Sequence, residues 1–594
     1  MTVIQPTWYS ATATNLAWFT NARFGLFLHW GLYAVPAGVW EGRQVPYIGE
    51  WIQHEELIPL AEYEKLAALF TAEHFNATQW VATALAAGMR YVVLTAKHHE
   101  GFALWDSRCD SFSSVSAAAC GRDIVRELAD ACHVGGLRLG LYYSHCVDWH
   151  EAHGGNLPDD IKEPTRLSGH GRTWGNDWDF QAGTAAGFES YLRNKVEPQL
   201  TELLTGYGDI ALIWFDTPTA SLQPAQAERL RDLIKHHQPG CLVGGRIGHG
   251  FQDFDSLGDN QVPTSPLQRP GETCMTLNDT WGYKAHDHAW AAASEVIGLL
   301  AACTATNANL LLNVGPMADG RLPTPALTCL TQVGDWLASS GNAIYGCGAA
   351  AMPNEFPWGI VTRRDSVAHL LINDPTCSEI AVPLPQNAEL KSTRLISRQA
   401  SRQDSGQLVK TSCSHTPAGS WLSITLSPVL NDLPRHVKLQ FTVEPEWDQV
   451  PAEDPTGVLV LTPRAAVGTF GPTGLKGERW NGWAAVGDSV TWNVRCQAAG
   501  RFRIEVLCGG ERYGEWYGGH TLELRSTNGY VNGLIHNGTR EIGRAAQHYP
   551  IYNVELGEIE LREGLQTLTL GITSTSGREP AHFPGLRLYR MTSE

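Results

Sequence analysis

The chain has 594 residues, more than one hydrophobic core usually holds, so we expect about two to four domains. A composition of 43% apolar and 18% charged residues is that of a folded globular protein and argues against extensive disorder. The formal net charge of -17 argues against a nucleic-acid partner, because phosphate binding relies on clustered Lys and Arg. The 21 Trp residues leave two uses open, stacking on sugar rings and filling cores.

The 13 cysteines are scattered from Cys109 to Cys508 and include no CxxC pair, so we expect reduced, mostly buried thiols. The N-terminal residues show neither a basic start nor a continuous apolar stretch. We therefore expect no signal peptide and a cytoplasmic location. No apolar run reaches the ~20 residues that a membrane-spanning helix needs, so no membrane partner is expected.

Residues 1–350 alternate short apolar runs with amphipathic helical stretches. We predict strands at 23–30, 91–96, 137–144, 209–216, 241–246, 274–278 and 309–315, and helices at 57–70, 78–87, 122–133 and 184–204. Nearly uninterrupted apolar strands separated by helices are typical of a parallel sheet buried on both faces. Seven or eight such units predict an α/β fold, a (β/α)8-like (TIM-type) barrel at 1–350, with a doubly wound open sheet as the alternative.

After residue 350 the pattern changes to segments of alternating polar and apolar residues bounded by Gly, Pro, Asn and Asp. This pattern predicts antiparallel β-sandwiches. The acidic, proline-rich stretch 445–455 predicts a linker. We therefore expect two C-terminal β-sandwich domains, at 351–447 and 456–594.

Reactive groups of a parallel barrel gather at the carboxyl ends of its strands. The predicted strands end there in polar or aromatic residues, in chain order His29-Trp30, Lys97-His98-His99-Glu100, Tyr142-Tyr143-Ser144, Trp214-Phe215-Asp216, Arg246, Asn278-Asp279 and Asn313. One polar residue can simply mark the end of a strand. All seven ends together indicate the rim of an active site.

Asp216 is the sharpest of these candidates, because it follows the apolar run 211–215 directly. Its carboxylate is either a helix cap or hydrogen-bond anchor, or a catalytic group at the barrel mouth. Cleavage of a glycosidic bond needs two carboxyls, one to protonate the leaving oxygen and one to attack the sugar or activate water.

The adjacent histidines His98 and His99 raise the alternative of a metal site. No HExxH or CxxC spacing supports a metal, so we expect no metal and no other cofactor. Neutral imidazoles donate and accept hydrogen bonds, which suits a row of sugar hydroxyls, and a buried structural role also stays open. The glycines of 244–250 do not satisfy the dinucleotide fingerprint G-x-G-x-x-G.

Six long motifs occur in order along residues 8–350: WFTNARFGLFLHWGLYAVP, YIGEW, AGMRYVVLTAKHHEGFALWDS, LRLGLYYSHCVDW, ALIWFD and ANLLLNVGP. They resemble the motifs of glycoside hydrolase family 29, the α-L-fucosidases. The resemblance implies a (β/α)8-like catalytic domain, a following β-sandwich, no metal, and hydrolysis with net retention.

By matched motif, the resemblance implies that Asp216 is the nucleophile of an exo-acting enzyme that releases terminal L-fucose through a covalent fucosyl-enzyme. The residues that it implies for substrate binding are His29, Glu50, Trp51, His98, His99, Tyr143, Trp214, Arg246 and Trp281. Among them, Trp281 would offer an apolar wall to the C6 methyl group, which prefers a desolvated aromatic surface.

The general acid has two candidates, Asp259 and Glu272. We prefer Asp259, because the family's acid usually falls on the loop before a WE-like segment that residues 270–274 resemble. Glu272 is the reserve, and Gly271 stands where that segment usually has Trp. Either group should have a raised pKa, so that it is protonated near neutral pH.

Residues from about 457 onward look like an accessory jelly-roll module similar to carbohydrate-binding modules. Tyr513, Trp516 and Tyr517 are candidates for a sugar-stacking platform there, and packing against the catalytic domain is the alternative. The expected partner is a fucosylated glycan substrate, and a homo-oligomer fits an enzyme of this size.

Three other functions stay open at this point. The first is a catalytically silent glycan-binding protein on the same scaffold. The second is an α-L-galactosidase-type glycosidase, whose substrate differs from an α-L-fucoside only at C6, where it lacks the methyl group. The third is a metal-dependent barrel hydrolase that uses His29, His98 and His99.

Overall fold

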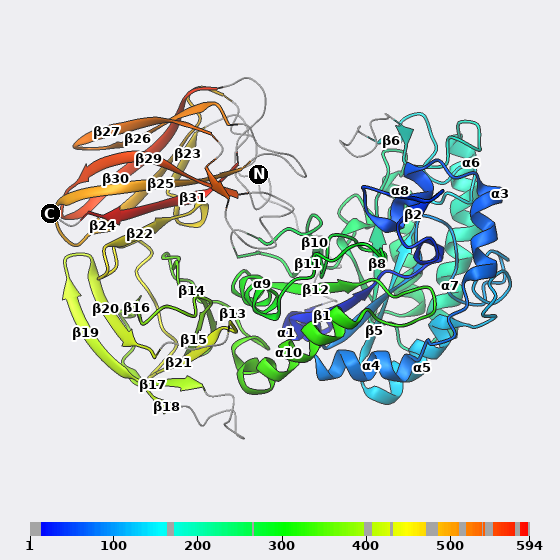
Figure 1. Cartoon of the computed structure of the whole chain (residues 1–594), viewed down its shortest axis with the longest axis horizontal. Coiled ribbons are helices and arrows are strands. Elements are labelled where there is room, and N and C mark those ends of the chain that lie inside the picture. Colours follow the sequence, from blue (N-terminus) through cyan, green and yellow to red (C-terminus); the bar gives the residue numbers. More distant parts are fainter. Residues whose placement is uncertain are drawn as a thin grey trace. The chain divides into compact units, whose positions relative to one another are not determined.

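The computed structural model describes residues 13–162, 172–263, 266–396, 407–427, 432–470, 485–509, 518–536, 538–540, 551–575 and 582–591 (Figure 1). The chain forms two compact units, one built mainly from residues up to Ala338 and one that holds most residues from Ser339 onward. Within the described ranges, no helix combines the length and the apolar character needed to cross a bilayer. All 13 cysteines are thiols rather than disulfides and nine are buried, as expected from their scattered spacing.

The first unit contains an eight-stranded parallel sheet, which confirms the predicted barrel-type α/β fold. Its central strands are buried along their whole length, because helices cover one face and side chains fill the other. In spatial order the strands are β10 (Asp255–Ser256), β11 (Gly271–Thr276), β12 (Ala308–Val314), β1 (Phe24–Leu28), β4 (Tyr91–Lys97), β5 (Arg138–Ser144), β8 (Leu212–Asp216) and β9 (Leu242–Val243).

The two edges of this sheet meet, so that it curls into a barrel. Asp253 N donates a hydrogen bond to Val243 O at 2.9 Å, and Gly245 N donates to Ser256 Oγ at 3.2 Å. The eighth strand, β10, has only two residues and was not among the predicted runs.

Helices cover the outside of the barrel, and α4, α5, α7 and α8 can be followed around the strands in Figure 1. The helices are α1 (Ala13–Ala22), α2 (Ile52–Glu55), α3 (Leu60–Tyr63), α4 (Ala77–Ala86), α5 (Ile124–Gly135), α6 (Ala185–Tyr191), α7 (Glu197–Gly206), α8 (Pro224–His237), α9 (Ala293–Ala305) and α10 (Thr324–Ser340). Short turns are η2 (Leu32–Ala34), η3 (Gly49–Trp51), η4 (Glu64–Leu69), the π-turn η5 (Leu192–Val196), η6 (Gly245–Ile247), η7 (Gly341–Ala343) and η8 (Pro463–Ala465), and short strand pairs are β2 (Val39–Trp40) with β3 (Arg43–Gln44) and β6 (Ile161–Lys162) with β7 (Arg172–Thr173).

The second unit begins with two sheets that share one hydrophobic core, which is the arrangement of a β-sandwich. Leu370 and Leu439 contribute to this core from one sheet, and Val382 and Leu422 contribute from the other. The sheets are β13 (Gly348–Ala349), β14 (Gly359–Arg364), β15 (Val367–Ile372), β21 (Arg435–Phe441), β17 (Leu390–Ile396) and β18 (Gln407–Leu408), and β16 (Glu379–Pro383), β20 (Gly419–Thr425) and β19 (Lys410–Thr416).

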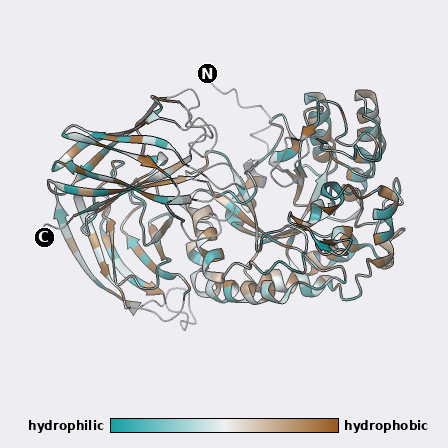
Figure 2. Ribbon diagram, turned by 45° about the horizontal axis from the view of Figure 1, so that its top comes forward, coloured by the Kyte–Doolittle hydropathy of each residue, from teal (hydrophilic) through white to brown (hydrophobic). Residues whose placement is uncertain are grey.

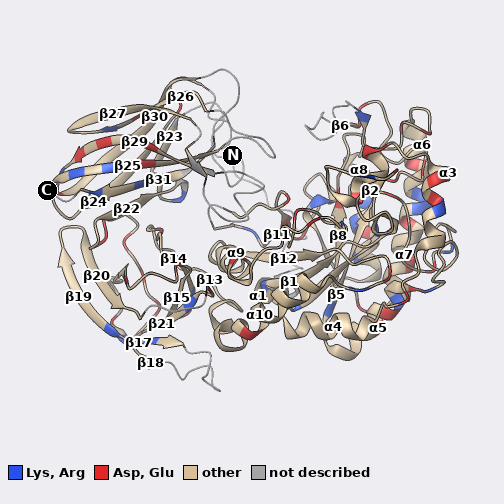
Figure 3. Cartoon of the chain, in the orientation of Figure 1, with Lys and Arg blue, Asp and Glu red and all other residues tan. Residues whose placement is uncertain are grey.

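A separate core lies between the last two sheets, consistent with a second sandwich. Burial alternates residue by residue along β24, and Figure 2 shows the matching alternation of hydropathy on these strands. On β25 and β29 charges of opposite sign pair across the strands, as in Arg501–Glu558 at 3.2 Å (Figure 3). The sheets are β22 (Val458–Leu461), β31 (His582–Arg590), β25 (Gly500–Gly509), β29 (Ile551–Leu561) and β28 (Thr539–Arg540), and β23 (Gly468–Phe470), β24 (Ser489–Cys496), β30 (Gly564–Ser574), β26 (His520–Ser526) and β27 (Gly529–Ile535).

The stretch 445–455, predicted as a linker, is held in place along much of its length. Trp447 belongs to the first sandwich core, and Glu453 is fully buried and bonded to Arg590 Nη2 at 2.8 Å. The acidic composition therefore reflects a buried ion pair as well as exposed residues. The boundaries 1–350, 351–447 and 456–594 stay predictions, and Tyr513, Trp516 and Tyr517 lie outside the described residues.

Candidate functional site

The carboxyl ends of the barrel strands bring most of the predicted site residues together. Asp216 is the last residue of β8, Arg246 lies in η6 just after β9, and Asp259 follows β10. The others reach the same mouth from the ends of β1, β4 and β12 and from the loops around η3 and after β11: His29, His98, His99, Asn313, Glu50, Trp51 and Trp281.

Two carboxylates share one guanidinium at this mouth. Arg246 Nη1 donates to Asp216 Oδ1 at 2.8 Å, and Arg246 Nη2 donates to Asp259 Oδ1 at 2.5 Å. The fork of the guanidinium therefore holds the two carboxylate oxygens within about 8 Å of each other. The side chains of Asp216 and Asp259 keep 16% and 24% of their surface exposed, so both are accessible from the mouth.

Asp216 is fixed by further donors, which leave its carboxylate in one orientation. Thr217 N donates to Oδ1 at 2.8 Å, and the Tyr142 hydroxyl donates to Oδ2 at 2.9 Å. Burial, followed by the charge of Asp216, raises the pKa of Tyr142 well above its usual value, so Tyr142 stays a donor. His99 Nε2 lies 3.6 Å from the same Oδ2.

The tautomer of His99 follows from its hydrogen-bond chain. The Ser144 hydroxyl gives its only proton to Val147 O at 2.6 Å, so Ser144 Oγ accepts from His99 Nδ1 at 2.6 Å. In the neutral ring Nε2 is then an acceptor. Because Asp216 Oδ2 is also an acceptor, a hydroxyl group that approaches both atoms can donate to either of them.

Hydrogen bonds also determine the tautomer of His29. Asn313 Nδ2 donates to Trp281 O at 2.8 Å, which turns its amide oxygen toward His29 Nδ1 at 2.7 Å. His29 therefore donates from Nδ1, and burial lowers its pKa to about 4, so Nε2 is a neutral acceptor at physiological pH.

Two buried polar atoms at the site have no hydrogen-bond partner among the described residues, Glu50 Oε1 and His98 Nδ1. The other oxygen of Glu50 accepts from Gly282 N at 2.8 Å, and burial raises the pKa of this carboxyl to about 7. Burial, followed by the neighbouring rings of His99 and His29, holds the pKa of His98 well below its usual value. A buried polar atom without a partner costs free energy, which a ligand can recover.

Aromatic rings form the walls around these polar groups. Trp281 lies 5.1 Å from His29, and Trp51 lies 5.3 Å from His99, both as ring-centroid distances. Trp214 lies below the mouth, where its ring is parallel to Tyr142 within 18° and carries the Arg246 guanidinium at 4.8 Å from its centroid.

Tyr143 does not line this pocket, and its predicted role is wrong. Its hydroxyl donates to Gln199 Oε1 on α7 at 2.6 Å, outside the barrel. In the β5–β8 register Tyr142 pairs with Trp214 and Ser144 with Asp216, so alternate residues point inward and Tyr143 points outward. The sequence pattern indicates Tyr142 and Asn313 only as strand ends, and the register of β5 against β8 is what selects Tyr142.

Glu272, the reserve candidate for the acid, lies inside the barrel rather than at its mouth. It is the second residue of β11 and is 1% exposed. Its Oε1 accepts from Trp214 Nε1 at 2.9 Å, and its Oε2 accepts from the Tyr91 hydroxyl. Burial raises its pKa to about 7.

Among the described residues, no three His, Cys, Asp or Glu side chains gather in a way that could hold a metal ion. His29 and His99, two of the three histidines considered as metal ligands, already use Nδ1 in hydrogen bonds to Asn313 and Ser144.

A parallel barrel with paired carboxylates and a hydroxyl-accepting pocket at its mouth defines the barrel glycosidase class. Residues 1–342 match the family model described as Alpha-L-fucosidase, and the chain belongs to this family.

Relatives support this assignment over different parts of the chain. Plasma alpha-L-fucosidase from Homo sapiens is 31% identical over 366 residues, which cover 58% of this chain and 72% of that protein. The crystal structure of alpha-L-fucosidase from Vibrio sp. strain EJY3 matches with a TM-score of 0.84 at 25% identity, over 98% of both chains. Alpha-L-fucosidase AlfC from Lactobacillus casei, in complex with its α-L-fucose product, matches with a TM-score of 0.51 at 40% identity, over 55% of this chain and 99% of that one. Another AlfC structure holds Fucα(1,6)GlcNAc.

Proposed function

We propose that this chain is a retaining, exo-acting α-L-fucosidase that releases terminal L-fucose from fucosylated glycans through a covalent intermediate on Asp216. The observation that carries the proposal is the pair of accessible carboxylates, Asp216 and Asp259, held on Arg246 at the barrel mouth. The membership of the chain in the α-L-fucosidase family supports the same substrate.

The pocket suits a sugar with several hydroxyl groups. His29 Nε2, His99 Nε2 and Glu50 Oε1 offer acceptors, and sugar hydroxyls are donors. His98 lies among these acceptors, and Trp51 forms the wall beside His99. Trp281, 6% exposed, gives the C6 methyl of fucose an apolar wall that a C6 hydroxyl could not use.

In the proposed first step Asp216 attacks the anomeric carbon while Asp259 gives a proton to the leaving oxygen. A protonated Asp259 leaves Arg246 to balance the charge of Asp216. In the second step Asp259 takes a proton from water, which releases fucose with net retention. Glu272 is not given this role, because Trp214 and Tyr91 occupy both of its oxygens.

The direct test is release of nitrophenol from 4-nitrophenyl α-L-fucoside, compared with the α-L-galactoside under the same conditions. We expect turnover of the fucoside and at least about fivefold lower kcat/KM for the galactoside, because a buried hydroxyl without a partner loses at least about 1 kcal/mol. Fucose binding without turnover would instead identify a silent glycan-binding protein, and preference for the galactoside would identify the other glycosidase. Because AlfC holds Fucα(1,6)GlcNAc, that disaccharide is the first natural substrate to test.

A further inference from the structure

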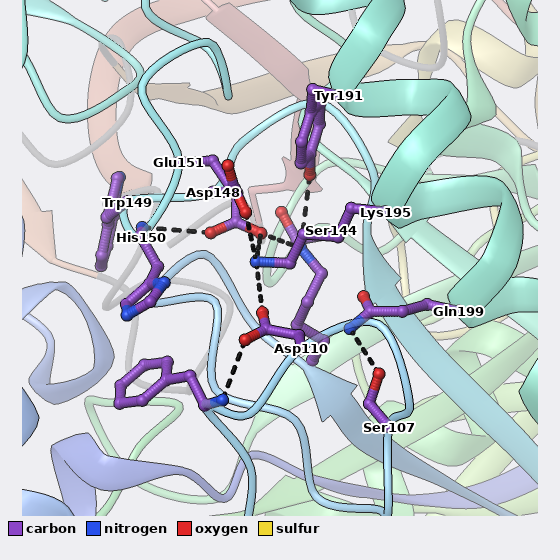
Figure 4. Close-up of polar contacts among 12 residues, drawn as sticks. Ser107, Asp110, Ser144, Asp148, Trp149, His150, Glu151, Tyr191, Lys195 and Gln199 are labelled. Carbon is purple, nitrogen blue, oxygen red and sulfur yellow. Dashed lines mark hydrogen bonds and ion pairs between the residues drawn. The ribbon is translucent and has the colours of Figure 1, made fainter.

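A cluster of charged side chains lies between the end of β4 and η5, and Figure 4 shows Asp110, Asp148, Glu151 and Lys195 turned toward one another. Asp148 Oδ2 accepts from Lys97 Nζ at 2.8 Å and lies 3.1 Å from Lys195 Nζ. Lys195 also contacts Asp110 at 2.6 Å and Glu151 at 3.1 Å. The side chains of Lys97 and Asp148 are 0% exposed. None of these residues contacts Asp216 in the described hydrogen bonds and ion pairs, so the cluster is separate from the reacting groups.

Asp148 balances the charge of both lysines. Burial by itself would raise the pKa of Asp148, yet Lys195 and Lys97 together hold it well below its usual range. Burial lowers the pKa of Lys97, and Asp148 opposes that effect. Asp148 is also the carboxylate that forms an ion pair with Lys97, so its loss would leave a buried cation next to His98.

Asp148 also shapes the turn that follows it. Its Oδ1 accepts from His150 N at 3.1 Å, and Glu151 N donates to Asp148 O at 3.1 Å. A Cβ atom on Gly154 would lie 2.8 Å from Asp148 Cβ, so the chain packs closely on this side chain. Together with the ion pair between Asp148 and Lys97, these contacts tie the turn 148–151 to the end of β4.

The same turn braces two walls of the pocket. Trp149 N donates to His99 O at 2.6 Å. The Trp149 ring, 0% exposed, lies 5.2 Å from Trp51 and 5.6 Å from His99. Any shift of the turn would move the ring that supports both residues.

We propose that Asp148 is a positioning residue: by joining Lys97 to Lys195 it fixes the turn 148–151 so that His99 and Trp51 are preorganised for the sugar. The inference rests on the proposed function, which gives His99 and Trp51 their sugar-binding role. Asp148 touches neither substrate nor reacting atoms, and its effect on fucose binding is transmitted through Trp149.

The test compares the affinity for L-fucose, measured by calorimetry on folded protein, in wild type, D148N, K97M and the double variant. We expect each single variant to weaken fucose binding at least tenfold and to raise KM more than it lowers kcat. We expect the double variant to bind fucose about as weakly as the weaker-binding single variant. The two losses of affinity should not multiply, because the two residues act as one unit. If D148N does not fold, K97M carries the comparison with wild type.

The matched control is D253N, which removes another buried carboxylate of the barrel, paired with Lys235 at 2.6 Å. It should lower the thermal midpoint while leaving fucose affinity within about threefold of wild type, because Asp253 bonds to Lys235 and Val243 and, in the described hydrogen bonds, to none of the pocket residues. Single variants that bind fucose like wild type, or losses that multiply in the double variant, would overturn the inference. A wild type that neither binds fucose nor cleaves its aryl glycoside would instead overturn the proposed function.

Discussion

Replacing Glu272 by Gln removes the charge of a buried carboxyl while keeping its shape. The Gln side-chain oxygen can still accept from Trp214 Nε1, and its amide nitrogen can donate to the Tyr91 hydroxyl oxygen, where Glu272 now accepts. The charged and titratable neighbours of Glu272 are Tyr91, Arg246 and Cys274. The variant therefore isolates the ionisation of one carboxyl.

The magnitude follows from the pKa of Glu272. Burial raises it from 4.5 to about 7. Between these two pH values the native protein binds more protons than the unfolded chain. The contribution of Glu272 to the free energy of unfolding is therefore fully present below pH 4.5 and is lost as the pH rises to 7. The loss over this window is about 3 kcal/mol, and the Gln variant should not show it.

The assay is the thermal unfolding midpoint of wild type and E272Q at pH 5 and pH 8, at one scan rate. The midpoint of E272Q minus that of wild type should be roughly 4 °C larger at pH 8 than at pH 5, given a unit of about 350 residues. Glu50 and Glu100, whose burial also raises their pKa to about 7, are present in both proteins and cancel in this difference.

The same variant separates a supporting carboxyl from a catalytic acid. E272Q should lose equal factors of kcat/KM on an aryl fucoside and on a natural disaccharide, because Glu272 is not proposed to protonate the leaving group. A midpoint difference that does not change with pH would refute the burial argument. A loss confined to the disaccharide would make Glu272 the acid.

Three further predictions follow from the site. D259A should lose much less kcat/KM on 4-nitrophenyl α-L-fucoside than on Fucα(1,6)GlcNAc, since nitrophenolate leaves without a proton; equal losses would remove Asp259 as the acid. Y142F should lower kcat/KM about 10- to 100-fold by removing a charge-assisted hydrogen bond to Asp216, whereas Y143F should change only stability, by about 1 kcal/mol. Prolonged EDTA dialysis should leave kcat unchanged, and activity restored only by added metal would revive the metal-dependent alternative.

The long strands of the barrel were predictable because they are apolar along their whole length. The run predicted at 91–96 became β4 (Tyr91–Lys97), and that at 309–315 became β12 (Ala308–Val314). The two-residue strand β10 was not predicted, because so short a run has no periodicity to detect. The run predicted at 274–278 begins earlier, at Gly271, which places Glu272 inside the barrel.

The polar residues at the mouth were predictable from their position at strand ends, whereas their hydrogen bonds were not. The prediction selects Tyr143, whose neighbour Tyr142 lies on the opposite face of the same strand. The pairing of Tyr142 with Trp214 shows that Tyr142 faces the inside of the barrel. The predicted helix at 184–204 is divided into α6 and α7 by the π-turn η5, which carries Lys195. The partners of Lys195, Asp148 and Asp110, come from distant loops, and local sequence patterns do not encode such contacts.

The proposed mechanism requires that Asp216 bonds to the anomeric carbon of fucose. The most direct measurement treats the enzyme with 2-deoxy-2-fluoro-α-L-fucosyl fluoride, whose second step is slow, and maps the modified peptide by mass spectrometry. We expect one fluorofucosyl group on Asp216 and recovery of activity as it hydrolyses. A label on another residue, or a first-formed sugar product of inverted anomeric configuration, would contradict it.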